Sequence, residues 1–92
     1  MYVLIQSFPK TGKVICLGVY KKSIQAVGDA IIETNRYVDK SKLDLSKIRF
    51  STAYTDESKD DSRLNRYMDA YYDDDMLINY WLLFVSSDVV GL

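Results

Sequence analysis

The sequence predicts a small α+β domain: an antiparallel sheet of about four strands, one main helix on one face of it, and a short acidic helix. Three observations lead to this fold class. Short runs rich in β-formers lie near both ends of the chain, the segment from Ser23 has the 3.6-residue apolar period of an amphipathic helix, and alternation returns at Ile48. The predicted order is therefore ββα-β-α-β. A chain of 92 residues holds a single modest core, so residues 1–92 are expected to fold as one domain.

A hairpin is predicted at the start of the chain. Tyr2 to Phe8 is short and rich in β-formers, and residues 14–20 form a nearly continuous apolar run, which is typical of a strand buried on both faces. Pro9 and Gly12 lie between the two runs. Proline presets φ and glycine can adopt the positive φ that closes a short hairpin loop, so we expect a turn there.

The main helix is predicted from Ser23 to about Val38. Ser23 is a good N-cap because its hydroxyl can accept a hydrogen bond from a free backbone N–H. Apolar residues at helical spacing form the stripe that should face the sheet: Ile24, Val27, Ile31 and Val38, with Ala26, Ala30 and Ile32 beside them. The core is expected to include Leu4, Ile15, Leu17, Val27, Ile31, Phe50 and Leu83.

The second half of the chain is predicted to hold two strands with a short helix between them. Lys47 to Thr55 alternates between apolar and polar residues, as a half-buried strand does. Leu64, Tyr67, Met68 and Tyr71 recur at i, i+3, i+4 and i+7, which indicates a helix from about Asp61 to Tyr72. The apolar run of residues 76–85 fits a central strand better than a helix, but both remain open.

Charge is divided unevenly along the chain. Residues 1–50 carry nine Lys/Arg and four Asp/Glu, whereas residues 51–92 carry three Lys/Arg and nine Asp/Glu. Eight of these carboxylates lie between Thr55 and Asp75, together with three tyrosines. The asymmetry suggests a molecule with one acidic face.

The Asp73–Asp75 triplet is the feature that points to a function. At the C-terminal end of a helix, carboxylates oppose the helix dipole, so helix stability gives no reason for three of them. Tyrosine is common among the residues that dominate binding energy in interfaces. We therefore predict a partner-binding surface with these members: Asp56, Glu57, Asp60, Asp61, Tyr67, Asp69, Tyr71, Tyr72, Asp73, Asp74 and Asp75.

Catalysis and metal binding are not expected. The chain has no histidine, which removes histidine bases and histidine-bearing zinc sites. Cys16 is the sole cysteine, so it can form neither an intramolecular disulfide nor a thiolate cluster. The sequence therefore predicts no enzyme activity, no catalytic residue, no metal site and no cofactor.

A soluble protein that works in the cytoplasm is expected. Met1 to Phe8 lacks the basic region of a signal peptide, and no apolar run approaches the roughly 20 residues that span a bilayer. No membrane partner is therefore predicted, and a homodimer is left open.

The Thr55–Asp75 stretch resembles small phage-encoded acidic inhibitors: anti-CRISPR proteins, antirestriction DNA mimics and the uracil-DNA glycosylase inhibitor. In the last, a TAY-like turn before an acidic loop is similar to residues 51–58, which read STAYTDES. The resemblance implies a non-enzymatic inhibitor that blocks a basic, nucleic-acid-binding site on a host defence or nucleic-acid enzyme. It implies no direct contact with nucleic acid. Nine cations in the first half and the lack of N-terminal helices depart from that pattern.

Two other interpretations remain open. The order of hairpin, Gly18-Val19-Tyr20 and serine-started helix is similar to that of small ββα proteins of bacteria and phages. It implies an immunity-type or regulatory interaction module without nucleic-acid mimicry. Binding of nucleic acid through the lysines of the first half is the third interpretation, but no recognition motif supports it.

Overall fold

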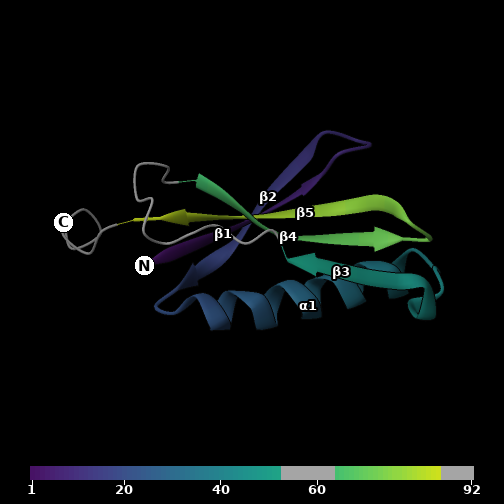
Figure 1. Ribbon diagram of the computed structural model, residues 1–92, viewed down its shortest axis with the longest axis horizontal. Helices are drawn as coiled ribbons and strands as arrows, with labels where there is room; N and C mark the ends of the chain where they lie inside the picture. Colours follow the sequence, from purple (N-terminus) through teal and green to yellow (C-terminus); the bar gives the residue numbers. More distant parts are fainter. Residues whose placement is uncertain (53–63, 86–92) are drawn as a thin grey trace.

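A computed structural model describes residues 1–52 and 64–85, which form one five-stranded sheet and one main helix (Figure 1). The elements follow the order ββαβββ, with one turn of 3₁₀ helix before the third strand. Their bounds are β1 (Tyr2–Phe8), β2 (Lys13–Tyr20), α1 (Ser23–Lys40), η1 (Leu45–Lys47), β3 (Ile48–Thr52), β4 (Leu64–Tyr72) and β5 (Asp75–Phe84). The predicted α+β class with one main helix is confirmed, and the sheet has five strands instead of about four.

Every neighbouring pair in the sheet is antiparallel, and the spatial order is β2-β1-β5-β4-β3. The first and last strands of the described chain therefore lie side by side at the centre. Helix α1 runs along one side of the sheet, and its C-terminal end lies at the same end of the molecule as the β1–β2 and β4–β5 turns (Figure 1). We call the side beneath α1 the covered face.

The hydrophobic core lies between α1 and the covered face. Leu4 on β1 and Ile78 and Tyr80 on β5 are fully buried there, and Met68 and Ala70 of β4 pack beside them. Of the residues predicted as core, Ile15, Leu17 and Phe50 pack against this cluster and Leu4 lies within it. Leu83 points to the opposite side, because its neighbour Leu82 belongs to the core and side chains alternate along a strand.

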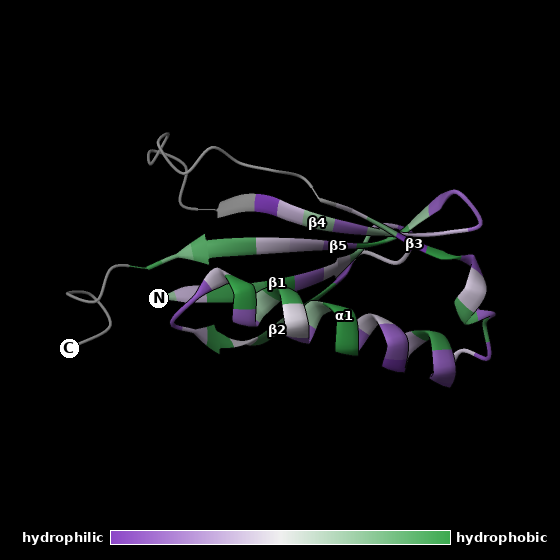
Figure 2. Cartoon of the chain, turned by 60° about the horizontal axis from the view of Figure 1, so that its bottom comes forward, coloured by the Kyte–Doolittle hydropathy of each residue, from purple (hydrophilic) through white to green (hydrophobic). Residues whose placement is uncertain are grey.

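The buried stripe of α1 differs from the prediction. Its buried residues recur every four positions: Ala26, Ala30, Thr34 and Val38. Ile24 and Ile32 are more than half exposed, and Ile31 is 37% exposed. Small alanines let the helix approach the sheet closely, which larger isoleucines would prevent. Figure 2 shows hydrophobic and hydrophilic positions alternating along the helix. The helix begins at Ser23, as predicted, and ends at Lys40, but Ser23 is its first residue and not its N-cap. Lys22 is the N-cap, and its backbone N–H donates to the Gln25 side chain.

The predicted acidic helix is wrong, because residues 64–72 form strand β4. The register of β4 against β5 shifts between Arg66 and Met68, so Tyr67 is an extra residue at a β-bulge. Tyr67 and Met68 consequently both contact the core. The bulge breaks the two-residue period of the strand, and this irregularity produced the helix-like spacing in the sequence. The strand predicted for residues 76–85 is confirmed as β5, and residues 48–52 of the predicted Lys47–Thr55 strand form β3.

No helix in the described part of the chain is long and apolar enough to cross a membrane.

Candidate functional site

The residues of the predicted acidic surface do not form one surface in the described structure. Asp56, Glu57, Asp60 and Asp61 lie outside the described residues. The other seven divide into three groups, which occupy the covered side of the sheet, its opposite side and the β4–β5 turn.

The Asp73–Asp75 triplet has a structural explanation in the β4–β5 hairpin. Tyr72 pairs with Asp75, and the two residues between them have positive φ, 50° at Asp73 and 66° at Asp74. Two consecutive positive φ values define a type I′ turn, for which Asn, Asp and Gly are preferred. Folding therefore does give a reason for Asp73 and Asp74, because they lie in a hairpin turn and not at the predicted helix end.

Cations accompany the carboxylates at this turn. Arg49 Nη2 lies 3.7 Å from Asp74 Oδ1, and Lys10 Nζ lies 3.9 Å from Asp75 Oδ2. All four side chains are at least 60% exposed, so each pair contributes at most about 1 kcal/mol. The turn is therefore a mixed-charge surface, although its three carboxylates are exposed to solvent.

The three predicted tyrosines are half-buried and serve three different contacts. Tyr67 packs against the core, and its hydroxyl donates to the Ser23 carbonyl oxygen at 3.5 Å. Tyr71 lies under Arg49, whose guanidinium carbon is 4.7 Å from the ring centroid. The Tyr72 hydroxyl accepts a hydrogen bond from the Asp44 N–H. The three rings thus contact separate elements and do not form one binding surface.

Asp69 is buried on the side of the sheet opposite α1. Its Oδ1 atom accepts from Arg66 Nε at 2.9 Å and from Asn79 Nδ2 at 2.7 Å. The Met76 sulfur accepts from Arg66 Nη2 and from Asn79 Nδ2, which closes the cluster. The bond to Asp69 raises the pKa of the Arg66 guanidinium. Because one carboxylate oxygen accepts from both a cation and an amide, the arrangement suits positioning of the two strands rather than proton transfer.

Around this cluster the sheet presents apolar side chains that no described element covers. We call this side the open face. Its members follow from the strand register and the alternation of side chains: Val3, Ile5 and Ser7 on β1, Val14, Cys16 and Val19 on β2, Arg66, Asp69 and Tyr71 on β4, Met76, Asn79, Trp81 and Leu83 on β5, and Arg49 and Ser51 on β3. Val14 and Val19 are 65% and 57% exposed, and the Trp81 indole N–H donates to the Ser7 hydroxyl at 3.2 Å.

The open face was not predicted as a site, although the sequence carries a signal for it. The apolar runs of residues 14–20 and 76–85 are continuous rather than alternating, as in strands buried on both faces. In the structure, described elements cover only one of those faces.

Comparisons of this chain with protein-family models, with curated proteins and with solved structures found no match.

Proposed function

We propose that this protein is a non-enzymatic interaction domain and that the open face of its sheet contacts a partner protein. The observation that carries the proposal is the apolar row of Val3, Ile5, Trp81 and Leu83 across the two central strands, continued by exposed Val14 and Val19 at the edge. Exposed apolar patches of this kind mark interaction surfaces in soluble proteins. This function corresponds to the interaction module without nucleic-acid mimicry.

The dimensions of the open face suit a specific interface. Four neighbouring strands spaced about 4.8 Å apart and about 25 Å long present roughly 500 Å². Both partners together would then bury about the 1,000 Å² that a specific interface needs. The size is therefore at the lower limit for a stable complex, so a transient or regulated contact is expected.

The chemistry of the face restricts the partner. Arg66 lies beside the apolar row, and its side chain is 39% exposed although it is bonded to Asp69. The guanidinium has five donors, so it can bind a second carboxylate while keeping the first. We expect a partner that presents aliphatic or aromatic side chains next to an acidic residue.

Matched double variants test which side of the sheet binds. Val14→Lys/Val19→Lys puts two charges on the open face at positions that are 65% and 57% exposed. Ile24→Lys/Ile32→Lys makes the same change on α1, at positions that are 69% and 51% exposed. A partner captured from lysate by the parent protein should be lost by the first variant and retained by the second. Equal capture by both variants would contradict the proposal.

Trp81 supplies a direct readout of the same contact. It is the only tryptophan of the chain and lies half-buried on the open face. Burial of the indole by the purified partner should shift its emission to shorter wavelength. If the emission of a saturated complex equals that of the free protein, the partner binds elsewhere. A concentration series in light scattering reveals whether a second copy of this chain is the partner.

A blocking inhibitor of the phage type is the second candidate function. The observation that favours it is the row of three exposed carboxylates at the β4–β5 turn, Asp73, Asp74 and Asp75. Such a group is attracted to a basic nucleic-acid-binding site and speeds encounter with it. Under this proposal the protein acts in the cytoplasm of a bacterial host cell, on a protein and not on nucleic acid itself.

Replacement of the triplet by asparagine separates the two functions. The triple variant should bind an enzyme partner more slowly and with a weaker salt dependence if the carboxylates steer binding. It should bind normally if the open face is the working surface. Surface plasmon resonance at two salt concentrations measures both properties.

A further inference from the structure

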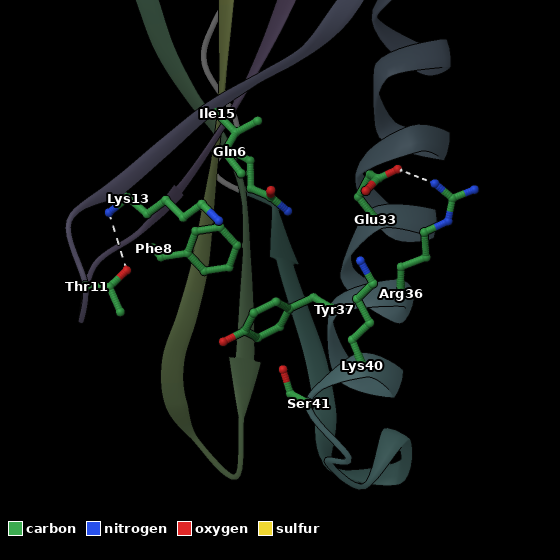
Figure 3. A pocket seen from close by; sticks show the side chains of 10 residues that line it. All are labelled: Gln6, Phe8, Thr11, Lys13, Ile15, Glu33, Arg36, Tyr37, Lys40 and Ser41. Carbon is green, nitrogen blue, oxygen red and sulfur yellow. Dashed lines mark hydrogen bonds and ion pairs between the residues drawn. The ribbon is translucent and has the colours of Figure 1, made fainter.

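A cleft with a volume of about 470 Å³ opens between the C-terminal half of α1 and the β1–β2 hairpin (Figure 3). It lies on the covered side of the sheet, away from the open face. Its size is within the range of small-molecule sites. The residues that line it come from both elements: Gln6, Phe8, Thr11, Lys13 and Ile15 from the hairpin, and Glu33, Arg36, Tyr37, Lys40 and Ser41 from the helix and its end.

Gln6 supplies an acceptor in the cleft wall, because a chain of hydrogen bonds fixes the orientation of its amide. The Thr34 hydroxyl donates to the Ala30 carbonyl at 2.9 Å, so the Tyr80 hydroxyl, 2.6 Å away, must donate to Thr34. The Tyr80 oxygen is then free to accept from Gln6 Nε2 at 3.0 Å. Gln6 is only 4% exposed, and no described side chain donates to its carbonyl oxygen. That oxygen is an acceptor available to a ligand N–H.

Two aromatic rings form the apolar part of the cleft. The centroids of Phe8 and Tyr37 are 5.0 Å apart, with their planes inclined by 45°. Ile15 lies next to them in the lining. Figure 3 shows the two rings in the middle of the view, with Gln6 above them. A flat ring can pack against such a surface while it donates to Gln6.

The rim of the cleft is cationic. Arg36 is paired with Glu33 at 3.0 Å, which balances one of the three positive charges. Lys13 and Lys40 have no ion-pair partner among the described residues. Lys13 extends from the hairpin to a point beside the Phe8 ring, and Lys40 extends along the helix on the opposite wall (Figure 3). Two unpaired lysines that line the same cleft favour an anionic group such as a phosphate.

We propose that this cleft binds a nucleoside phosphate, with the base against Phe8 and Tyr37, a base N–H donated to the Gln6 carbonyl oxygen, and the phosphate between Lys13 and Lys40. Each part of the ligand corresponds to one feature of the cleft. A phenyl phosphate offers the ring and the charge but no ring N–H, so the Gln6 acceptor favours a nucleobase. The proposal is independent of the open face and does not require a partner protein.

Isothermal titration of the full chain tests the proposal with simple probes. The four common nucleoside monophosphates are compared with inorganic phosphate, ribose 5-phosphate, phenyl phosphate and an uncharged nucleoside. At least one nucleotide should bind saturably and more tightly than every partial probe. Equal affinity for inorganic phosphate would reduce the cleft to a general anion site and overturn the proposal. Equal affinity for phenyl phosphate would show that Gln6 does not recognise a base and would overturn the proposal. The absence of saturable binding by any nucleotide would overturn it as well.

Lysine variants locate the phosphate. Lys13→Ala and Lys40→Ala change exposed side chains, so folding should be preserved, and each should weaken nucleotide binding about ten-fold or more. Lys21→Ala removes an exposed lysine outside the cleft and should leave the affinity unchanged. The nucleoside should bind the parent, Lys13→Ala and Lys40→Ala alike. Retention of full nucleotide affinity by both cleft variants, or an equal loss in Lys21→Ala, would contradict the proposed phosphate position.

A Gln6→Leu variant tests the acceptor. It removes the carbonyl oxygen and should abolish the preference for a nucleotide over phenyl phosphate while phosphate binding persists. Because Gln6 also donates to Tyr80, circular dichroism must first show that the variant folds. If it does not fold, chemical-shift changes of the Gln6 side-chain amide of the parent protein on titration give the answer. A nucleotide that saturates without moving that signal would contradict the proposal.

Discussion

The two faces of the sheet are built on the same strands but hold their polar groups in different ways. On the covered face the fully buried polar groups are neutral: Gln6, Thr34 and Tyr80 form a chain that ends on a helix carbonyl. On the open face the central polar group is the charged pair Arg66–Asp69. A neutral network avoids the cost of removing charge from water beneath the helix. The charged pair lies where the guanidinium still reaches solvent, as its partial exposure shows.

The difference also concerns apolar side chains. The covered face encloses its apolar residues under small helix residues, whereas the open face leaves Val14 and Val19 mostly exposed. The open face carries apolar side chains that the described elements leave exposed to solvent. This exposed apolar surface is the physical basis for assigning binding to that side. Four experiments can contradict or sharpen this comparison.

Neighbouring leucines of β5 provide the largest expected contrast. Leu82 is 7% exposed and belongs to the core, whereas Leu83 points to the open face. Leu82→Ala should cost about 2–5 kcal/mol of unfolding free energy, because it removes buried contacts and leaves a cavity. Leu83→Ala should cost about 1 kcal/mol. Urea denaturation measures both values. Equal costs would mean that the open face is as tightly packed as the covered face.

The neutral network of the covered face gives the next effect. Tyr80→Phe removes the hydroxyl that joins Gln6 to Thr34 and leaves the Gln6 amide without its acceptor. The expected loss is about 1–3 kcal/mol, mainly from the unsatisfied buried donor. Tyr71→Phe is the matched control on the open face and should be nearly neutral if the ring, not the hydroxyl, contacts Arg49. Thermal melts of both variants measure the loss of stability. A Tyr80→Phe protein as stable as its parent would indicate that water replaces the hydroxyl in the network.

A turn variant provides a reference that changes neither face. Asp73→Asn/Asp74→Gly introduces the Asn-Gly sequence that type I′ turns prefer. It also removes the backbone strain at residue 74, because glycine adopts a positive φ readily. It should raise the unfolding free energy by about 0.5–1 kcal/mol, reduced by loss of the weak Asp74–Arg49 pair. Denaturant midpoints measure the gain. Destabilisation would mean that the carboxylates at the turn contribute more than the backbone strain costs.

The smallest effect is confined to alkaline pH. Burial, together with a hydrogen bond to Asp29, raises the pKa of Tyr20 to about 12, against 10.0 for a free tyrosine. The stability from this shift is fully present below pH 10.0 and is lost as the pH rises through about 12. Tyr20→Phe should therefore melt with a shallower decline over that interval than the parent protein. Melting curves that decline in parallel would show that Tyr20 ionises as freely when folded as when unfolded.

The sequence predicted the fold better than the site. The first hairpin, the main helix and the strand at residues 76–85 were identified because each has a clear period or a continuous apolar run. The buried side of α1 was missed because alanine and threonine carry little hydrophobic signal, although their size determines how closely the helix packs. Strand β4 was missed because its bulge at Tyr67 imitates helical spacing. No local pattern indicates where strands distant in sequence will pair, so the side of the sheet that α1 leaves uncovered could not be assigned.

The central place of β5 also governs how a nascent chain can fold. Gln6 and Tyr80 are bonded across 74 positions of sequence, and β5 separates β1 from β4. Until residues 75–84 have left the ribosome, the β1–β2 hairpin and the β3–β4 hairpin each keep an unpaired edge, which β5 occupies in the folded sheet. Unpaired edges of this kind recruit other chains or chaperones. We therefore expect closure of the sheet to follow synthesis as a late, slow step set by long-range strand pairing.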